Sequence, residues 1–258
     1  MPFLLSDHVR IAYELVGAGP PIILLHGFAS NRVRNWKDPR WFDTLTTAGR
    51  QVVALDFRGH GESDKPHDPG AYSAAHMTGD VIRVLDHLGM ARVDVMGYSM
   101  GARIAAALLA RHPARFNCGI LAGIGAGVLA DRRNAEAIAH ALETSDKRSI
   151  SDLVGSAFRQ FAEAGGNDLI ALAACMRGLG RMVDAAALRT VRAPVLIVVG
   201  ERDTLVGDPR PLADLIPGAE LVMVPNKDHL TTVGAAVSKE NVLRFLDARG
   251  LDAPARAG

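Results

Sequence analysis

Cysteine, aromatic residues and net charge are all scarce in this chain. Its 258 residues include two cysteines, 5% aromatic residues and a formal net charge of +1 at pH 7. Cys118 falls in a predicted buried strand and Cys175 in a helical region, so the sequence predicts no disulfide framework. A near-neutral charge gives no electrostatic reason to bind nucleic acid or an anionic membrane, and we expect neither as a partner.

Long apolar runs and metal-binding clusters are also missing from the sequence. No segment approaches the length needed to cross a bilayer, and the first residues lack the basic stretch and apolar run of a secretion signal. Cytoplasmic residence is therefore the expectation. No histidine, cysteine and glutamate cluster has metal-ligand spacing, and residues 123–127 (GIGAG) lack the spacing of a dinucleotide loop. We expect no metal and no cofactor.

What the sequence does contain is an alternation of apolar strands and helices. Apolar residues make up 48% of the chain, enough for one full core. Strands are predicted at residues 9–16, 21–25, 51–55, 92–96, 115–121, 193–200 and 220–225. Helices are predicted from an N-cap at Ser73 to about residue 88, and over residues 100–112 and 238–248. The pattern predicts the α/β class, with a mostly parallel sheet covered on both faces.

The middle of the chain has a different pattern. Residues 125–192 contain helical segments only, with starts predicted near Asp131, Ser151, Asn167 and Asp184. We interpret this segment as a helical cap inserted into the core, so that residues 1–124 and 193–258 form the two parts of the core. A cap in this place is expected to cover the strand ends and line a pocket.

The most informative motif is residues 97–101 (GYSMG), which place Ser99 between two glycines where a predicted strand meets a predicted helix. A serine at so tight a turn has a strained backbone, tolerable when its neighbours carry almost no side chain, as Gly97 and Gly101 do. The turn raises the hydroxyl above the sheet edge and points the first helix amides at whatever binds there. Ser99 is therefore a candidate nucleophile. The alternative is a structural turn whose serine caps the helix.

A serine nucleophile needs a histidine to take its proton and an acid to orient that histidine. Asp203 follows the strand at 193–200, and His229 follows the strand at 220–225. Like Ser99, both therefore lie just past the C-terminal end of a strand. In an open parallel sheet these ends share the edge at which ligands bind, so we expect the three side chains to meet there.

Other polar side chains near this edge leave alternatives. Glu201 stays open as a second candidate for the acid. Asp56 also follows a strand, but Arg58 is expected to be its structural partner. His26 and His60 lie in glycine-flanked turns, and we expect them to fix loop conformation through hydrogen bonds.

Together with residues 97–101, four further motifs in the expected order make the chain resemble the α/β-hydrolase superfamily, in its small cap-bearing form with a serine nucleophile. These four are residues 25–28 (LHGF), 56–63 (DFRGHGES), 200–203 (GERD) and 228–229 (DH). The resemblance covers nearly the whole length. It implies a roughly eight-stranded, mostly parallel sheet with an inserted helical cap.

The resemblance also implies a role for each site residue. Ser99 corresponds to the nucleophile, His229 to the general base and then acid, and Asp203 to the orienting carboxylate. The backbone amides of Phe28 and Met100 correspond to the oxyanion hole. For the substrate pocket we predict six lining residues: Phe28, Tyr98, Phe158, Phe161, Met176 and Met182. For the residues in the cap segment, ordinary cap core is the alternative.

These roles predict a serine hydrolase that cleaves a small carboxylic ester or lactone, its small-molecule partner, through an acyl-enzyme intermediate. A C–C bond hydrolase or a lyase of the menaquinone-synthesis type shares the same residues and stays open, as does a binding module without turnover. Haloalkane dehalogenases and epoxide hydrolases of this superfamily are disfavoured, because both use an aspartate where Ser99 stands. The sequence does not indicate an oligomeric state.

Overall fold

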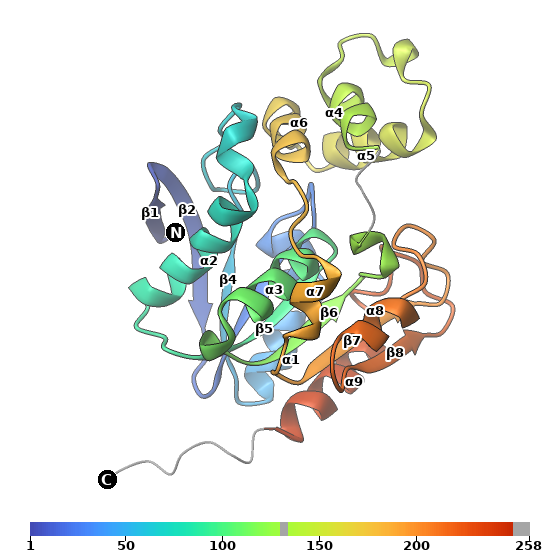
Figure 1. The fold of residues 1–258 in the computed structure, drawn as a ribbon. Coiled ribbons are helices and arrows are strands. Elements are labelled where there is room, and N and C mark those ends of the chain that lie inside the picture. Colours follow the sequence, from blue (N-terminus) through green and yellow to red (C-terminus); the bar gives the residue numbers. More distant parts are fainter. Residues whose placement is uncertain (130–133, 250–258) are drawn as a thin grey trace.

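One eight-stranded sheet organises the chain, in a computed structural model that describes residues 1–129 and 134–249 (Figure 1). The strand order is β1-β2-β4-β3-β5-β6-β7-β8. The strands are β1 (Phe3–Ser6), β2 (Val9–Val16), β3 (Pro21–Leu25), β4 (Gln51–Leu55), β5 (Val93–Tyr98), β6 (Phe116–Ala122), β7 (Val195–Gly200) and β8 (Glu220–Val224).

All pairs from β4 to β8 in this order are parallel, whereas β1 pairs with β2, and β2 with β4, in the antiparallel sense. The C-terminal ends of β3, β5, β7 and β8 therefore lie at one edge, where the polar motifs follow the strands. The predicted α/β class is confirmed. The pattern missed β1, because this four-residue strand offers too short an apolar run.

Helices cover both faces of the sheet. On one face, α2 (Ala74–His87), α3 (Met100–Arg111), α7 (Ala185–Arg189) and α8 (Arg210–Leu215) are in sequential contact. On the other, α1 (Trp41–Thr47) packs beside α9 (Ala236–Asp247). Two buried apolar clusters, one on each face, hold these layers to the sheet. The side chain of Ser73 accepts a hydrogen bond from the His76 amide, which makes it the N-cap of α2 as predicted.

Three helices form a separate layer above the strand ends (Figure 1). They are α4 (Ala135–Glu143), α5 (Leu153–Ala164) and α6 (Leu169–Gly178), and we call these three helices the cap. They share an apolar cluster of their own. Aspartate side chains cap α5, α6 and α7 by accepting a backbone N–H in the first turn, at Asp152, Asp168 and Asp184. Two of the predicted starts are thus one residue early, and the start near Asp131 lies outside the described residues. The division at residues 125 and 192 stays a prediction.

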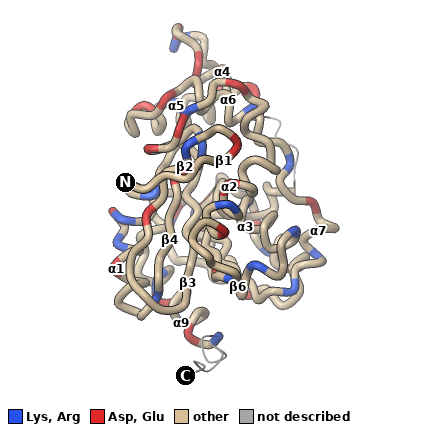
Figure 2. Tube along the Cα trace, turned by 90° about the vertical axis from the view of Figure 1, so that its left-hand side faces the viewer, with Lys and Arg blue, Asp and Glu red and all other residues tan. Residues whose placement is uncertain are grey.

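Short turns of helix complete the described parts of the chain: η1 (Val33–Lys37), η2 (Pro69–Tyr72), η3 (Pro113–Arg115), η4 (Ala126–Val128) and η5 (Lys147–Ser149). Basic and acidic positions are interspersed along the trace, in keeping with the small net charge (Figure 2). Within the described ranges, no helix combines the length and the apolar character that crossing a membrane requires.

Candidate active site

The turn between β5 and α3 holds Ser99 in a backbone conformation that is rare for a non-glycine residue, with φ 53° and ψ −110°. Glycine on either side makes this turn possible. A Cβ on Gly97 would lie 2.2 Å from the carbonyl oxygen of Gly101, and a Cβ on Gly101 would lie 2.0 Å from that of Leu25. The backbone of the helix start therefore packs directly against the ends of β5 and β3, which fixes where the Ser99 hydroxyl points.

Ser99, His229 and Asp203 form one hydrogen-bonded chain at the C-terminal edge of the sheet. Nε2 of His229 lies 3.0 Å from Oγ of Ser99, and Nδ1 of His229 lies 2.7 Å from Oδ2 of Asp203. The Asp203 side chain is fully buried, whereas that of His229 is 16% exposed. The carboxylate requires a proton on Nδ1, which leaves Nε2 free to accept the serine proton.

Two further hydrogen bonds hold this chain in place. Oδ1 of Asp203 accepts the amide of Leu205 at 3.1 Å, so both carboxylate oxygens have a donor. The hydroxyl of Tyr98 donates to the backbone oxygen of His229. Burial, followed by the nearby charge of Asp203, raises the pKa of Tyr98 above its usual value, so the hydroxyl keeps its proton.

The alternative acids point elsewhere. Glu201 is exposed, and its Oε2 accepts the amide of Asn226 at 3.1 Å. Asp56 accepts the amides of Arg32 and Glu62, each at 2.8 Å, and pairs with the Arg32 guanidinium. The expectation that Arg58 pairs with Asp56 was wrong. The guanidinium of Arg58 instead donates to Asp80 of α2, at 2.7 and 2.6 Å, whereas Asp56 is already paired with Arg32.

His26 and His60 are loop supports, as predicted. Nδ1 of His26 donates to the Gly27 oxygen at 2.7 Å, and its Nε2 accepts the Phe57 amide at 3.0 Å. Nδ1 of His60 lies 3.0 Å from the Arg58 oxygen. Complete burial is the main cause that lowers the pKa of His26 to about 4 and that of His60 to about 3. Both rings are neutral at pH 7.

The loop after β3 passes directly beside Ser99. A Cβ on Gly27 would lie 3.5 Å from Cβ of Ser99, and the Gly27 amide donates to Oδ1 of Asn35 at 3.0 Å. In the described part of the chain, the Phe28 amide has no hydrogen-bond acceptor. The Met100 amide begins α3 and has no acceptor within the helix. Two donors are thus available on the two segments that flank the serine.

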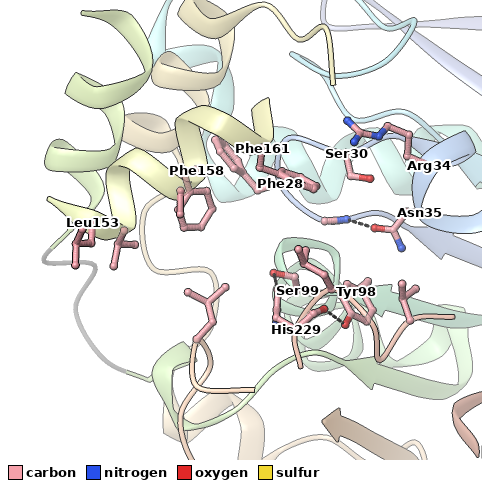
Figure 3. Close-up of a pocket in the computed structure, with 16 residues that line it drawn as sticks. Phe28, Ser30, Arg34, Asn35, Tyr98, Ser99, Leu153, Phe158, Phe161 and His229 are labelled. Atoms are coloured by element: carbon pink, nitrogen blue, oxygen red, sulfur yellow. Dashed lines mark hydrogen bonds between the residues drawn. The ribbon is translucent and has the colours of Figure 1, made fainter. Parts of the chain in front are cut away.

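A cavity of about 510 Å³ opens above Ser99 and His229, between the sheet edge and the cap. Four predicted pocket residues line it, namely Phe28, Tyr98, Phe158 and Phe161. Figure 3 shows the two cap phenylalanines on one side of the cavity and Ser99 with His229 on the other. The rings of Phe28 and Phe158 meet edge to face, with centroids 5.8 Å apart, so the cap touches the loop after β3 directly.

Met176 and Met182 do not line the cavity, which corrects the prediction. Met176 is 4% exposed and packs in the apolar cluster shared by α4, α5 and α6. Met182 is 5% exposed and packs in the larger cluster that includes α3. Both side chains therefore fill apolar cores, and no described residue of α6 lines the cavity.

Sequence reasoning missed most of the lining. Along α5 the cavity residues follow helical spacing, so the positions of Phe158 and Phe161 could have indicated the rest of that face: Leu153, Val154 and Ala157. The others lie on loops or on the short turn η1, which offer no period long enough to reveal them: Ser30, Arg34, Asn35, Leu205, Leu230 and Val233.

Comparison with known proteins places this geometry in a family. Residues 20–148 match the sequence profile of the alpha/beta hydrolase fold. The chain belongs to this family. A crystal structure of a hydrolase from Pseudomonas aeruginosa PA01 is similar over 95% of this chain and 97% of its own, with a TM-score of 0.79 and 28% identity. This hydrolase family and its fold agree with the resemblance seen in the sequence.

The curated relatives carry different activities in their names. Epoxide hydrolase 3 of Siraitia grosvenorii is 39% identical over 100 residues, which are 39% of this chain and 31% of that protein. The match therefore spans about a third of that relative. A protein of Bacillus subtilis (strain 168) named as a 2-succinyl-6-hydroxy-2,4-cyclohexadiene-1-carboxylate synthase is 25% identical over 88% of this chain and 91% of its own length.

Proposed function

We propose that this α/β hydrolase is a serine hydrolase that cleaves a carboxylic ester or lactone. The observation that carries the proposal is the hydrogen-bonded chain from Ser99 through His229 to Asp203, beneath a mainly apolar cavity. A serine hydroxyl becomes an effective nucleophile when a neutral imidazole accepts its proton, and the 3.0 Å contact supplies that acceptor.

The first half of the reaction acylates the serine. Oγ of Ser99 attacks the substrate carbonyl carbon while its proton moves to Nε2 of His229, and the buried Asp203 carboxylate stabilises the imidazolium that forms. The developing oxyanion accepts hydrogen bonds from the Phe28 and Met100 amides, each worth about 3–4 kcal/mol in the transition state. His229 then returns its proton to the leaving alkoxide, and the C–O bond breaks.

The second half returns the serine. A water molecule gives a proton to Nε2 of His229 and attacks the acyl carbon. The bond between that carbon and Oγ of Ser99 then breaks, His229 returns the proton to Oγ, and the carboxylic acid leaves. In sum, one ester and one water become one acid and one alcohol, or one hydroxy acid from a lactone. The overall reaction changes no oxidation state, and each proton passes through Nε2 of His229.

The serine argues against the activity named for the epoxide hydrolase relative. By the resemblance, epoxide hydrolases of this superfamily carry an aspartate at the nucleophile position, where this chain has Ser99. A C–C bond hydrolase or lyase is the second candidate, because the Bacillus subtilis relative named as a synthase of that type aligns along 88% of this chain. A binding module without turnover is the third, and the complete hydrogen-bonded chain counts against it.

The test is hydrolysis of p-nitrophenyl esters of increasing acyl length by the wild type, Ser99→Ala and Ser149→Ala. Ser149 is an exposed serine in η5 and serves as the matched control. We expect turnover by the wild type and the control, and a loss of several orders of magnitude in Ser99→Ala. Ester turnover that persists in Ser99→Ala, or is absent from the wild type, would contradict the proposal.

A further inference from the structure

The cavity has one polar end, formed by Ser30, Arg34 and Asn35, which follow Phe28 in the segment after β3. Figure 3 shows these three side chains together, with the guanidinium of Arg34 reaching in from η1. Among the described residues that line the cavity, Arg34 is the only arginine or lysine, and none is an aspartate or glutamate. The polar end therefore carries a positive charge with no counter-charge in the wall.

Two of its donors are buried without a partner. Nη1 of Arg34 and Nδ2 of Asn35 are shielded from solvent and make no hydrogen bond within the described structure. Asn35 is only 6% exposed, and its Oδ1 is occupied by the Gly27 amide, so the amino end of the amide is the free one. A buried donor without an acceptor is costly, and an acceptor brought by a bound molecule would remove that cost.

Among the described residues, the cap and not an acid holds Arg34 in position. Its guanidinium carbon lies 5.2 Å from the centre of the Phe161 ring, a cation–π contact. A Cβ on Gly165, just beyond α5, would lie 2.2 Å from Nη1, so the absence of a side chain there makes room for the guanidinium. By contrast, Arg32 two residues earlier is paired with Asp56 and Glu62. The neighbouring arginines thus differ, because one is neutralised in the core and the other faces the cavity.

We propose that this polar end binds a carboxylate group of the substrate, so that the natural ester or lactone is an anion with an apolar body. The inference rests on the proposed hydrolase function. An arginine fork binds a carboxylate through two parallel N–H···O bonds, and Asn35 adds a third donor. The rest of the wall is mainly apolar and ends in exposed leucines at Leu153, Leu205 and Leu230, which suit the apolar body.

The first test measures binding, so that it does not depend on turnover. Monomethyl adipate and dimethyl adipate share one skeleton and differ by one negative charge. We expect calorimetric titration of Ser99→Ala protein to give at least tenfold tighter binding of the monoester. Adding Arg34→Met should reduce this preference to twofold or less, Arg34→Lys should keep part of it, and Arg189→Met, an exposed arginine of α7, should leave it intact.

The second test uses turnover and locates the carboxylate. Wild-type kcat/KM is compared within two pairs of esters. Monomethyl adipate against dimethyl adipate tests a charge on the acyl side. 3-Carboxyphenyl acetate against phenyl acetate tests a charge on the alcohol side. A preference for the charged member of either pair, lost in Arg34→Met, supports the proposal and names the side. The absence of a preference in both pairs, or a preference that survives Arg34→Met, overturns it. If the charged ligand binds through Arg34 but no ester is cleaved, the carboxylate site stands and the hydrolase function fails.

Discussion

Nδ1 of His229 lies 2.7 Å from Oδ2 of Asp203, across 26 residues of sequence. The contact fixes the imidazole tautomer. An amide in place of the carboxylate would carry no negative charge to stabilise the imidazolium, and it would favour the wrong tautomer. We expect Asp203→Asn to lower the kcat for an ester by about 10³- to 10⁴-fold. Glu201→Gln is the control, because this exposed acid lies two residues away and its Oε2 accepts the Asn226 amide. An equal loss in both variants would reassign the acid.

Tyr98 holds the backbone of His229, and the effect of that hydrogen bond can be isolated. Tyr98→Phe removes the donor to the His229 oxygen, and we expect a loss of about 1 kcal/mol in unfolding free energy together with a lower kcat. Tyr72→Phe is matched, because the Tyr72 hydroxyl also donates to a backbone oxygen, that of Pro66, away from the cavity. This control should lose stability but keep its kcat. Urea unfolding and ester kinetics on both variants make the comparison.

The close approach of Gly101 to the end of β3 predicts a large packing defect on substitution. A Cβ there would lie 2.0 Å from the Leu25 oxygen, which is backbone and cannot move aside cheaply. We expect Gly101→Ala to lose about 1–3 kcal/mol of unfolding free energy or more, with loss of activity. Gly180→Ala has open space around its Cβ and should change stability by less than about 0.5 kcal/mol. Urea unfolding that shows equal stability for both variants would refute the packing argument.

Acid should destabilise the protein through its two buried histidines. The pKa of His60 is about 3 and that of His26 about 4, against an ordinary value of 6.5. At a pH between each lowered pKa and 6.5, the unfolded chain binds a proton that the folded chain does not. The free energy of unfolding therefore falls as the pH drops below 6.5, by about 1.4 kcal/mol per pH unit for each histidine. Urea unfolding at pH 7.5 and 5 should therefore show a smaller acid loss in His60→Gln than in the wild type. An identical loss would exclude His60 as a source.

The sequence was sufficient for the framework and for the three residues at the strand ends, because strand periodicity and chain order determine which edge they share. Strands β3 and β4 fall at their predicted residues. The pocket was harder to predict. Met176 and Met182 have apolar side chains that would suit a pocket, but both face apolar cores. Only the packing of the folded chain decides which of its apolar side chains reach the cavity. Arg34 and Asn35 lie in η1, a helical turn after the loop that follows β3, and its five residues are too few for a period to separate a cavity residue from a surface one.

Whether Ser99 is an activated nucleophile is tested most directly by labelling the wild-type protein with a fluorophosphonate and mapping the peptides by mass spectrometry. The reagent bonds covalently to a serine oxygen only when a neighbouring base has activated it. We expect one label, on Ser99, with none in Ser99→Ala and far slower labelling in His229→Ala. A label on a different serine, or an unmodified Ser99 in the wild type, would show that Ser99 is not the nucleophile.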